Sequence, residues 1–274
     1  MDWSLVLLSQ GIESTPELTP EGWVLCLEPN DHPRAEAILR QYRLENRGWP
    51  WQRPLPQVGF HWGSLGWCAV LALFYFADAI SSAGLRQVGM MDPVAVQHGA
   101  WWRLFTATLL HFDLAHLAAN VALGLPLFGL AMGRYGPGCA LLAATLAGAA
   151  GNLAGLWLRR QEFHGLGASG MVMGALGLLA VQLLSIGRPT PVARKYMLSG
   201  VLGGLMLFTL LGLSPAADVI AHTGGFAAGL AFGAALAWLP QKKLLNRSVT
   251  AVCLAVLAAL IAITWTLALS HPAS

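Results

Sequence analysis

Seven apolar stretches, each about long enough to cross a lipid bilayer, constrain this chain more than any other feature. A transmembrane helix needs about 20 predominantly apolar residues. The segments of this kind are 65–84, 114–132, 137–158, 168–186, 196–213, 216–239 and 249–269. Only 11% of the 274 residues are charged, whereas about 25% is usual for a soluble domain. The chain is therefore predicted to be an all-α polytopic membrane protein.

Charged residues are concentrated near the N-terminus, where they indicate a small segment outside the membrane. Residues 1–48 are expected to form a soluble, cytoplasmic ββα segment. Its strands lie in "WSLVLLSQG" and "GWVLCLEP", and Asp31 is a candidate N-cap of the helix that follows. The other expected parts are a Trp- and Pro-rich linker at 49–64, a six-helix membrane core at 65–240, and an extra C-terminal transmembrane helix with its tail at 241–274.

Charge and cysteine usage exclude several kinds of partner and site. The formal net charge is only +3, which gives no reason to expect a nucleic-acid partner. The four cysteines are far apart in apolar surroundings, so they indicate neither a disulfide framework nor a zinc site. We therefore expect no metal and no cofactor.

The distribution of basic residues predicts how the spans are oriented, because Lys and Arg are enriched on the cytoplasmic side of membrane proteins. With a cytoplasmic N-terminus, most of the 16 Lys and Arg residues lie inside, and only four lie outside: Arg86, Arg103, Arg159 and Arg160. The second, fourth and sixth spans then run from outside to inside. No signal peptide or organelle-targeting segment is evident, so a bacterial inner membrane is the expected location.

Polar side chains that are costly inside a membrane lie near the outer ends of these three spans. The second span carries His116 and Asn120, the fourth begins at Ser169, and the sixth carries His222. Such residues often mark functional sites. A serine needs an adjacent base to act as a nucleophile, and a helix N-terminus offers backbone N–H groups to an oxyanion. This combination predicts acyl-transfer chemistry near the outer face.

Glycines predict that the fourth and sixth spans pack closely. Small residues spaced four apart allow helix backbones to approach each other in a membrane. Generic helix packing alone would explain them, but close approach is also what a hydrogen bond between Ser169 and His222 requires. The glycines are Gly170 and Gly174 on the fourth span, and Gly225, Gly229 and Gly233 on the sixth.

Four motifs together resemble the rhomboid family of intramembrane serine proteases. They are "WWR" at 101–103, "HFDLAHLAAN" at 111–120, "GASG" at 167–170 and "AHTGGFAAG" at 221–229. The resemblance covers about residues 60–240. It implies a rhomboid-like six-helix core, to which the span at 249–269 adds a seventh helix, as in some members of the family.

The resemblance also implies an activity and a site. The activity is cleavage of membrane-anchored proteins, in or near their transmembrane segments. By motif, Ser169 resembles the nucleophile and His222 the general base of a catalytic dyad, while Asn120, His116 and the backbone N–H of Ser169 resemble the oxyanion hole. The other motif residues are expected to be structural: His111, Trp102, Arg103, Gly167, Gly170 and Gly225.

Several positions leave alternatives open. Met173 stands where many bacterial relatives have a tyrosine one turn after the serine, and Met132 where many have a glutamate, so altered packing is expected. Asp218 is four residues before His222. It is either a third catalytic residue or a carboxylate in the first helical turn that the helix dipole stabilises. Asp78 is interfacial or paired with an unidentified partner, and Asp113 is a candidate N-cap of the second span.

Other functions are less consistent with the sequence. A rhomboid-like protein that binds clients without cutting them typically lacks the serine or the histidine, and both are present here. A transporter is disfavoured because the polar residues lie in one leaflet and no inverted repeat is evident. The chain has no HExxH motif of a zinc protease and no GxGD motif of an aspartyl intramembrane protease. The expected partners are transmembrane protein substrates and the lipid bilayer.

Overall fold

The structure is a computed structural model that describes residues 2–20, 22–46, 59–80, 84–159, 163–182, 198–199, 202–209 and 218–271. The chain divides into two compact units, Met1–Gln57 and Val58–Ser274. The first unit combines helices with a β-hairpin, and the described part of the second is helical.

The N-terminal unit begins with a helix, so the strand predicted in "WSLVLLSQG" is wrong. A short apolar run has no decisive period, and here the helical form buries Leu7 against Ile12 and Ala35. The strand after this helix instead pairs antiparallel with the next strand, from Thr15↔Cys26 to Thr19↔Gly22. Asp31 precedes the last helix, but its side chain makes no capping hydrogen bond. The elements are α1 (Asp2–Ser9), β1 (Thr15–Thr19), β2 (Gly22–Cys26), η1 (Pro29–Asp31) and α2 (His32–Glu45).

Five helices in the described part of the second unit are long and apolar enough to cross a membrane, and they correspond to the first, second, third, sixth and seventh predicted spans. They are α3 (Gly63–Ile80), α7 (Leu114–Tyr135), α8 (Pro137–Leu158), α11 (Val219–Ala237) and α13 (Arg247–Ser270). The fourth span corresponds to α9 (Ser169–Ala180), a shorter apolar helix that ends before the predicted residue 186. Within the predicted span 196–213, residues 198–199 and 202–209 are helical, and the others lie outside the described residues.

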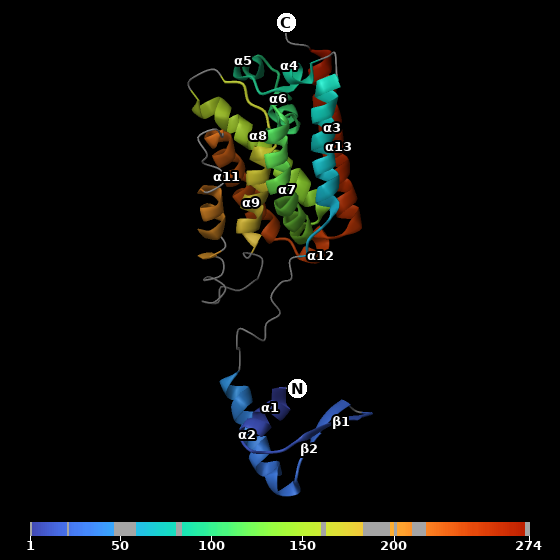
Figure 1. The fold of residues 1–274 in the computed structure, drawn as a ribbon, viewed down its shortest axis with the longest axis vertical. Helices are drawn as coiled ribbons and strands as arrows, with labels where there is room; N and C mark the ends of the chain where they lie inside the picture. The colour runs from blue at the N-terminus through green and yellow to red at the C-terminus, as the bar shows by residue number, and fades with distance from the viewer. Residues whose placement is uncertain are drawn as a thin grey trace. The chain divides into compact units, whose positions relative to one another are not determined.

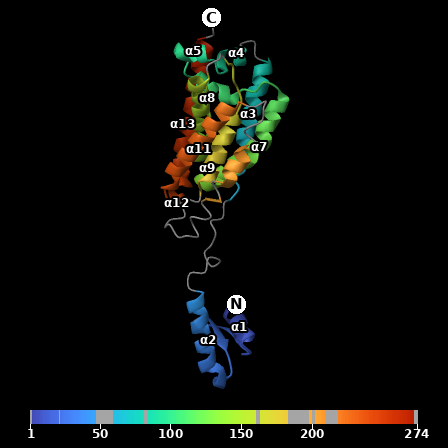
Figure 2. The same cartoon turned by 90° about the vertical axis from the view of Figure 1, so that its left-hand side faces the viewer.

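The segment 84–112 contains several short helical turns. Its α4 and α5 lie at one end of the helical unit, and α12 lies at the other end (Figures 1 and 2). The short elements are α4 (Leu85–Gly89), α5 (Pro93–Gln97), α6 (Arg103–Thr106), η3 (Ala107–Leu109) and α12 (Gln241–Leu244).

The shortest of these membrane helices, α9, is also the most central, because ten of its twelve residues are buried among α7, α8 and α11 (Figure 1). Glycines allow this packing. A Cβ atom on Gly225 would overlap the carbonyl oxygen of Gly170, and one on Gly229 would overlap that of Gly174. The second pair lies one turn further along both helices, so α9 and α11 run parallel in constant register. The predicted close packing of the fourth and sixth spans is confirmed.

The C-terminal helix α13 packs along α8 and also contacts α4 and α6. Its Trp265 packs against Phe74 of α3, with ring centroids 5.1 Å apart and the ring planes tilted by 31°. Near the other end of α13, the sulfur of Cys253 lies 3.6 Å from the sulfur of Cys139 on α8. The seventh helix is thus in direct contact with the core.

Oxidation of the protein in its membrane is expected to join Cys139 to Cys253. The two thiols would transfer two electrons to a membrane-permeant oxidant such as iodine, lose their protons and form an S–S bond, which requires neighbouring Cβ atoms. Mass spectrometry of digested protein should find the linked peptides in most molecules, and Cys139→Ser is the matched control. If Cys139 and Cys253 both remained free thiols after prolonged treatment with the oxidant, this would contradict the packing of α13 against α8.

Candidate active site

A cavity of about 680 Å³ collects polar side chains from α7, α9 and α11. Its walls include His116 and Asn120 of α7, Ser169 of α9 and His222 of α11. This volume is within the usual range of ligand pockets, about 300–1,000 Å³. The structure therefore brings together the four residues that the sequence placed on three separate spans.

Ser169 is the first residue of α9, directly after the turn at Ala168. Ala168 before it is fully buried and provides no side-chain cap, so the backbone N–H groups of the first helical turn have no capping side chain there. Gly167 has a φ of +136°, which favours glycine, and its N–H donates to the carbonyl oxygen of Ala107 at 2.9 Å. The turn thereby fixes the position from which α9 begins.

Gly167 also leaves room for the imidazole of His116. A Cβ atom on Gly167 would lie 2.7 Å from Cε1 of His116 and 3.8 Å from Oγ of Ser169. His116 itself is held by the start of α7, where the Asp113 carboxylate accepts a hydrogen bond from its backbone N–H at 2.7 Å. The predicted N-cap role of Asp113 is confirmed.

His222 lies in the second half of the first helical turn of α11 and is 6% exposed. Because Gly225 lies opposite Gly170, the constant register of the two helices places His222 beside the turn that leads into Ser169. His116 is close enough to His222 for the two side chains to interact electrostatically. The histidine and the serine therefore border the same cavity, from α11 and α9 respectively.

Asn120 is buried on the same face of α7 as His116. Its Nδ2 donates a hydrogen bond to the backbone carbonyl of His116 at 2.9 Å, which uses one of its two N–H bonds. The side chain is thereby held by its own helix at the cavity wall. Asn120 and His116 thus present polar groups to the same space as Ser169.

Charged residues complete the cavity wall, and one of them was not singled out by the sequence. Asp218 caps α11, since its Oδ1 accepts from the backbone N–H of Ala221 at 2.9 Å, and the same oxygen forms an ion pair with Arg159. This cap agrees with the helix-dipole interpretation of Asp218. The sequence does contain a signal for Arg159. This basic residue ends the third predicted span at the same side of the membrane where the acidic Asp218 begins the sixth.

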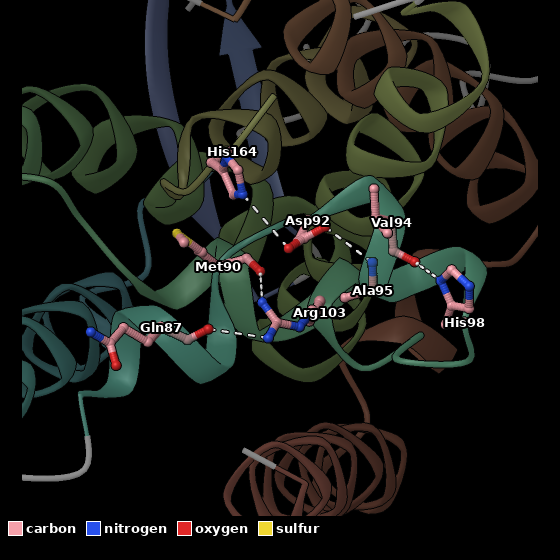
Figure 3. A network of polar contacts seen from close by, with 8 residues as sticks. All are labelled: Gln87, Met90, Asp92, Val94, Ala95, His98, Arg103 and His164. Carbon is pink, nitrogen blue, oxygen red and sulfur yellow. Dashed lines mark hydrogen bonds and ion pairs between the residues drawn. The ribbon is translucent and has the colours of Figure 1, made fainter. Parts of the chain in front are cut away.

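The motif residue Arg103 organises the 84–112 segment rather than the cavity. Its buried guanidinium donates to the carbonyl oxygens of Met90 at 2.9 Å and Gln87 at 3.1 Å (Figure 3). Nearby, Asp92 accepts from the backbone of Ala95 and lies 3.6 Å from His164 (Figure 3). Burial alone would raise the pKa of Asp92, but these backbone bonds and the neighbouring charges of His164 and Arg103 lower it below its usual value.

His111 and Trp102 are not among the described residues that line the cavity. The His111 ring is 1% exposed, and its centroid is 5.2 Å from that of His116. Burial, assisted by the nearby His116, lowers the pKa of His111 to about 4, so His111 is neutral at pH 7. Trp102 packs against Trp101 and against His271 beyond α13. Both rings therefore support the segment that precedes α7.

The remaining open positions have clear surroundings. Asp78 pairs with Arg86 at 2.5 Å, and Arg86 also donates to the carbonyl oxygen of Phe112, which supplies the partner that the sequence left unidentified. Met173 is buried and lines the cavity, whereas Met132 is buried in the core. The unusual methionine that borders the site is therefore Met173.

Comparison with known proteins agrees with this geometry. A family model described as the Rhomboid domain matches residues 98–239, from just after α5 to just after α11. Rhomboid protease GluP of Bacillus subtilis is 33% identical over 179 residues, which cover 61% of this chain and 33% of that protein. Rhomboid protease AarA of Providencia stuartii is 28% identical over 186 residues, covering 60% and 66%.

A plant protein is similar to the same extent. RHOMBOID-like protein 6, mitochondrial, of Arabidopsis thaliana is 31% identical over 167 residues, covering 59% of this chain and 52% of the relative. The chain thus spans from a third to about two thirds of the length of these relatives. The family match covers more than half of this chain and includes His116, Asn120, Ser169 and His222. This chain belongs to the rhomboid family.

Proposed function

We propose that this chain is an intramembrane serine endopeptidase in which Ser169 is the nucleophile and His222 the general base. The observation that carries the proposal is the shared cavity, whose walls include Ser169 at the start of α9 together with His222, Asn120 and His116. Two of the relatives are named rhomboid proteases, which supports a proteolytic activity. The function is thus inferred from a site and not from the fold alone.

The proposed reaction is acyl transfer in two stages. His222 accepts the proton of the Ser169 hydroxyl while Oγ attacks the carbonyl carbon of the substrate peptide bond. The resulting imidazolium donates that proton to the leaving amine as the C–N bond breaks, which leaves an acyl ester on Ser169. The imidazole then accepts a proton from water as the water oxygen attacks the ester carbonyl carbon. The imidazolium returns this proton to Oγ of Ser169 as the ester C–O bond breaks, which releases the new carboxyl terminus and restores the dyad.

The oxyanion of each tetrahedral intermediate would be stabilised by three donors. The backbone N–H of Ser169 lies in the first turn of α9, where N–H groups lack intrahelical acceptors. Asn120 and His116 would donate from α7, on the cavity wall. Donors that are already in place before the reaction contribute about 10²–10³-fold each to kcat.

The substrate is proposed to be a membrane-anchored protein cut in or near its transmembrane segment. The cavity is bordered by the first turns of α7, α9 and α11, so water and the scissile bond must meet at that end of the helices. A helical peptide bond is shielded by its own hydrogen bonds, so the substrate must unwind locally. With the N-terminus in the cytoplasm, this end faces outward, in a bacterial inner membrane.

A fluorophosphonate probe is expected to label Ser169 of the purified, membrane-embedded protein. The probe reacts only with an activated serine, so labelling should disappear in Ser169→Ala and His222→Ala, and a metal chelator should leave it unchanged. Mass spectrometry identifies the labelled residue. Labelling at another serine would contradict the proposal. A wild-type protein that binds a membrane-anchored substrate but is neither labelled nor active would instead be a client-binding member of the family.

A further inference from the structure

We propose that Arg159 is a positioning residue that joins the helix carrying His222 to the loop that leads into Ser169. The inference rests on the proposed protease function and identifies a residue that would maintain the geometry of its dyad. Arg159 follows α8 directly, and its backbone N–H donates to the carbonyl oxygen of Gly155 at 3.1 Å. Its position is therefore set by α8, the most buried of the five long apolar helices.

On one side, the Arg159 guanidinium holds the first turn of α11. Its Nη2 pairs with Oδ1 of Asp218, the same oxygen that caps the helix through Ala221. The carbonyl oxygen of Asp218 accepts a hydrogen bond from the backbone N–H of His222 at 2.9 Å. The ion pair is thus connected to His222 through a single residue.

The helix backbones also meet at this point. A Cβ atom on Gly151 of α8 would overlap the carbonyl oxygen of Ala221 on α11. Little space therefore separates α8 from the first turn of α11, and the Arg159–Asp218 pair links the two helices just beyond this contact. A shift of Asp218 would move the turn that carries His222.

On the other side, Arg159 contacts the loop that leads into α9. Its Cζ lies 4.1 Å from the centroid of the Phe163 ring, within the range of a cation–π interaction. Two residues later, Gly165 exchanges backbone hydrogen bonds with Met91 at 2.8 and 3.2 Å. A Cβ atom on Gly165 would lie 3.8 Å from Oδ2 of Asp218. The loop that ends at Ser169 therefore meets the start of α11 beside Arg159.

Partial burial makes the pair sensitive to loss of either member. The side chains of Arg159 and Asp218 are only 25% and 28% exposed, and both line the cavity together with His164. Removing one partner of a desolvated pair leaves the other charge uncompensated, whereas removing both does not. If Arg159 and Asp218 position the site as a pair, the rate losses caused by substituting each of them should not add up in the double variant.

The test compares Arg159→Gln, Asp218→Asn and the double variant in the full-length, membrane-embedded protein. Asparagine retains an oxygen that can cap α11, so this substitution removes the charge without removing the cap. Each single variant should lower both the rate of fluorophosphonate labelling of Ser169 and kcat about tenfold, since small displacements of reacting groups are costly, with KM unchanged. The double variant should be no slower than either single one, and Arg159→Lys should recover part of the rate.

Controls separate this inference from its alternatives. The exposed Arg247, at the start of α13, provides a matched Arg→Gln variant that should leave both rates unchanged. Wild-type labelling rates in Arg159→Gln, or additive losses in the double variant, would overturn the proposal. A raised KM with unchanged kcat and labelling would overturn it too, because Arg159 would then bind substrate. Failure of the wild-type protein to label at Ser169 would refute the protease function itself.

Discussion

Substitution of Ser169 by alanine is expected to abolish cleavage of a membrane-anchored substrate, with a loss in kcat of about 10⁴–10⁶-fold. The hydroxyl oxygen is the proposed nucleophile, and no other serine is present on the described walls of the cavity. His222→Ala should cause a loss of similar size, because without a base the hydroxyl is a weak nucleophile at neutral pH. The double variant should be no worse than either single variant, because the two residues act as one unit.

Cleavage is measured by mass spectrometry or gel electrophoresis of a model transmembrane substrate reconstituted with the enzyme. Ser248→Ala and His98→Ala are matched controls, because both residues are exposed and neither lines the cavity. Thermal unfolding should show that every variant remains folded. Cleavage by Ser169→Ala at a rate close to that of the wild type would refute the assignment of the nucleophile.

The substitution Gly225→Val is expected to reduce activity by at least about 10²-fold while the protein still inserts into the membrane. A Cβ atom at this position would overlap the backbone carbonyl of Gly170, which cannot move aside as a flexible side chain can. The helices α9 and α11 would have to separate, and Ser169 and His222 would separate with them. Misplacement of reacting groups by about 1 Å can cost about 10²-fold in rate, and overpacking costs a further 1–3 kcal/mol or so of stability.

Gly66→Val is the matched control for this experiment, because a Cβ atom on Gly66 of α3 has no heavy atom within 4 Å. Substrate cleavage, fluorophosphonate labelling and the midpoint of thermal unfolding are compared for the two variants and the wild type. Only Gly225→Val should be impaired in all three. Wild-type activity and stability of Gly225→Val would show that α9 and α11 do not approach as closely as described.

Local patterns predicted much of the fold and of the candidate site. The apolar lengths located the five long helices of the described residues, because a membrane helix must satisfy its own backbone within one contiguous segment. The capping role of Asp113 depends only on residues in the next turn. The glycines spaced four apart on α9 and α11 predicted the contact between these helices.

Local sequence patterns did not predict structural features that depend on contacts with residues elsewhere in the chain. The segment 3–9 is helical because Leu7 packs against residues of the following hairpin and helix region, which its own sequence does not encode. The ion pair between Asp78 and Arg86 joins α3 to α4. That between Arg159 and Asp218 joins residues far apart in the chain. Charge alone does not say which opposite charges will meet.

The sequence by itself determined that this chain is a helical membrane protein with rhomboid motifs on three of its spans, because apolar length and motif spacing are properties of contiguous residues. Only the tertiary structure decided that Ser169, His222, Asn120 and His116 border one cavity. It also placed Arg159 against both Phe163, in the loop before α9, and Asp218, at the start of α11. Those contacts depend on the register and separation of packed helices. Glycine contacts and partly buried charges between distant residues set this register and separation.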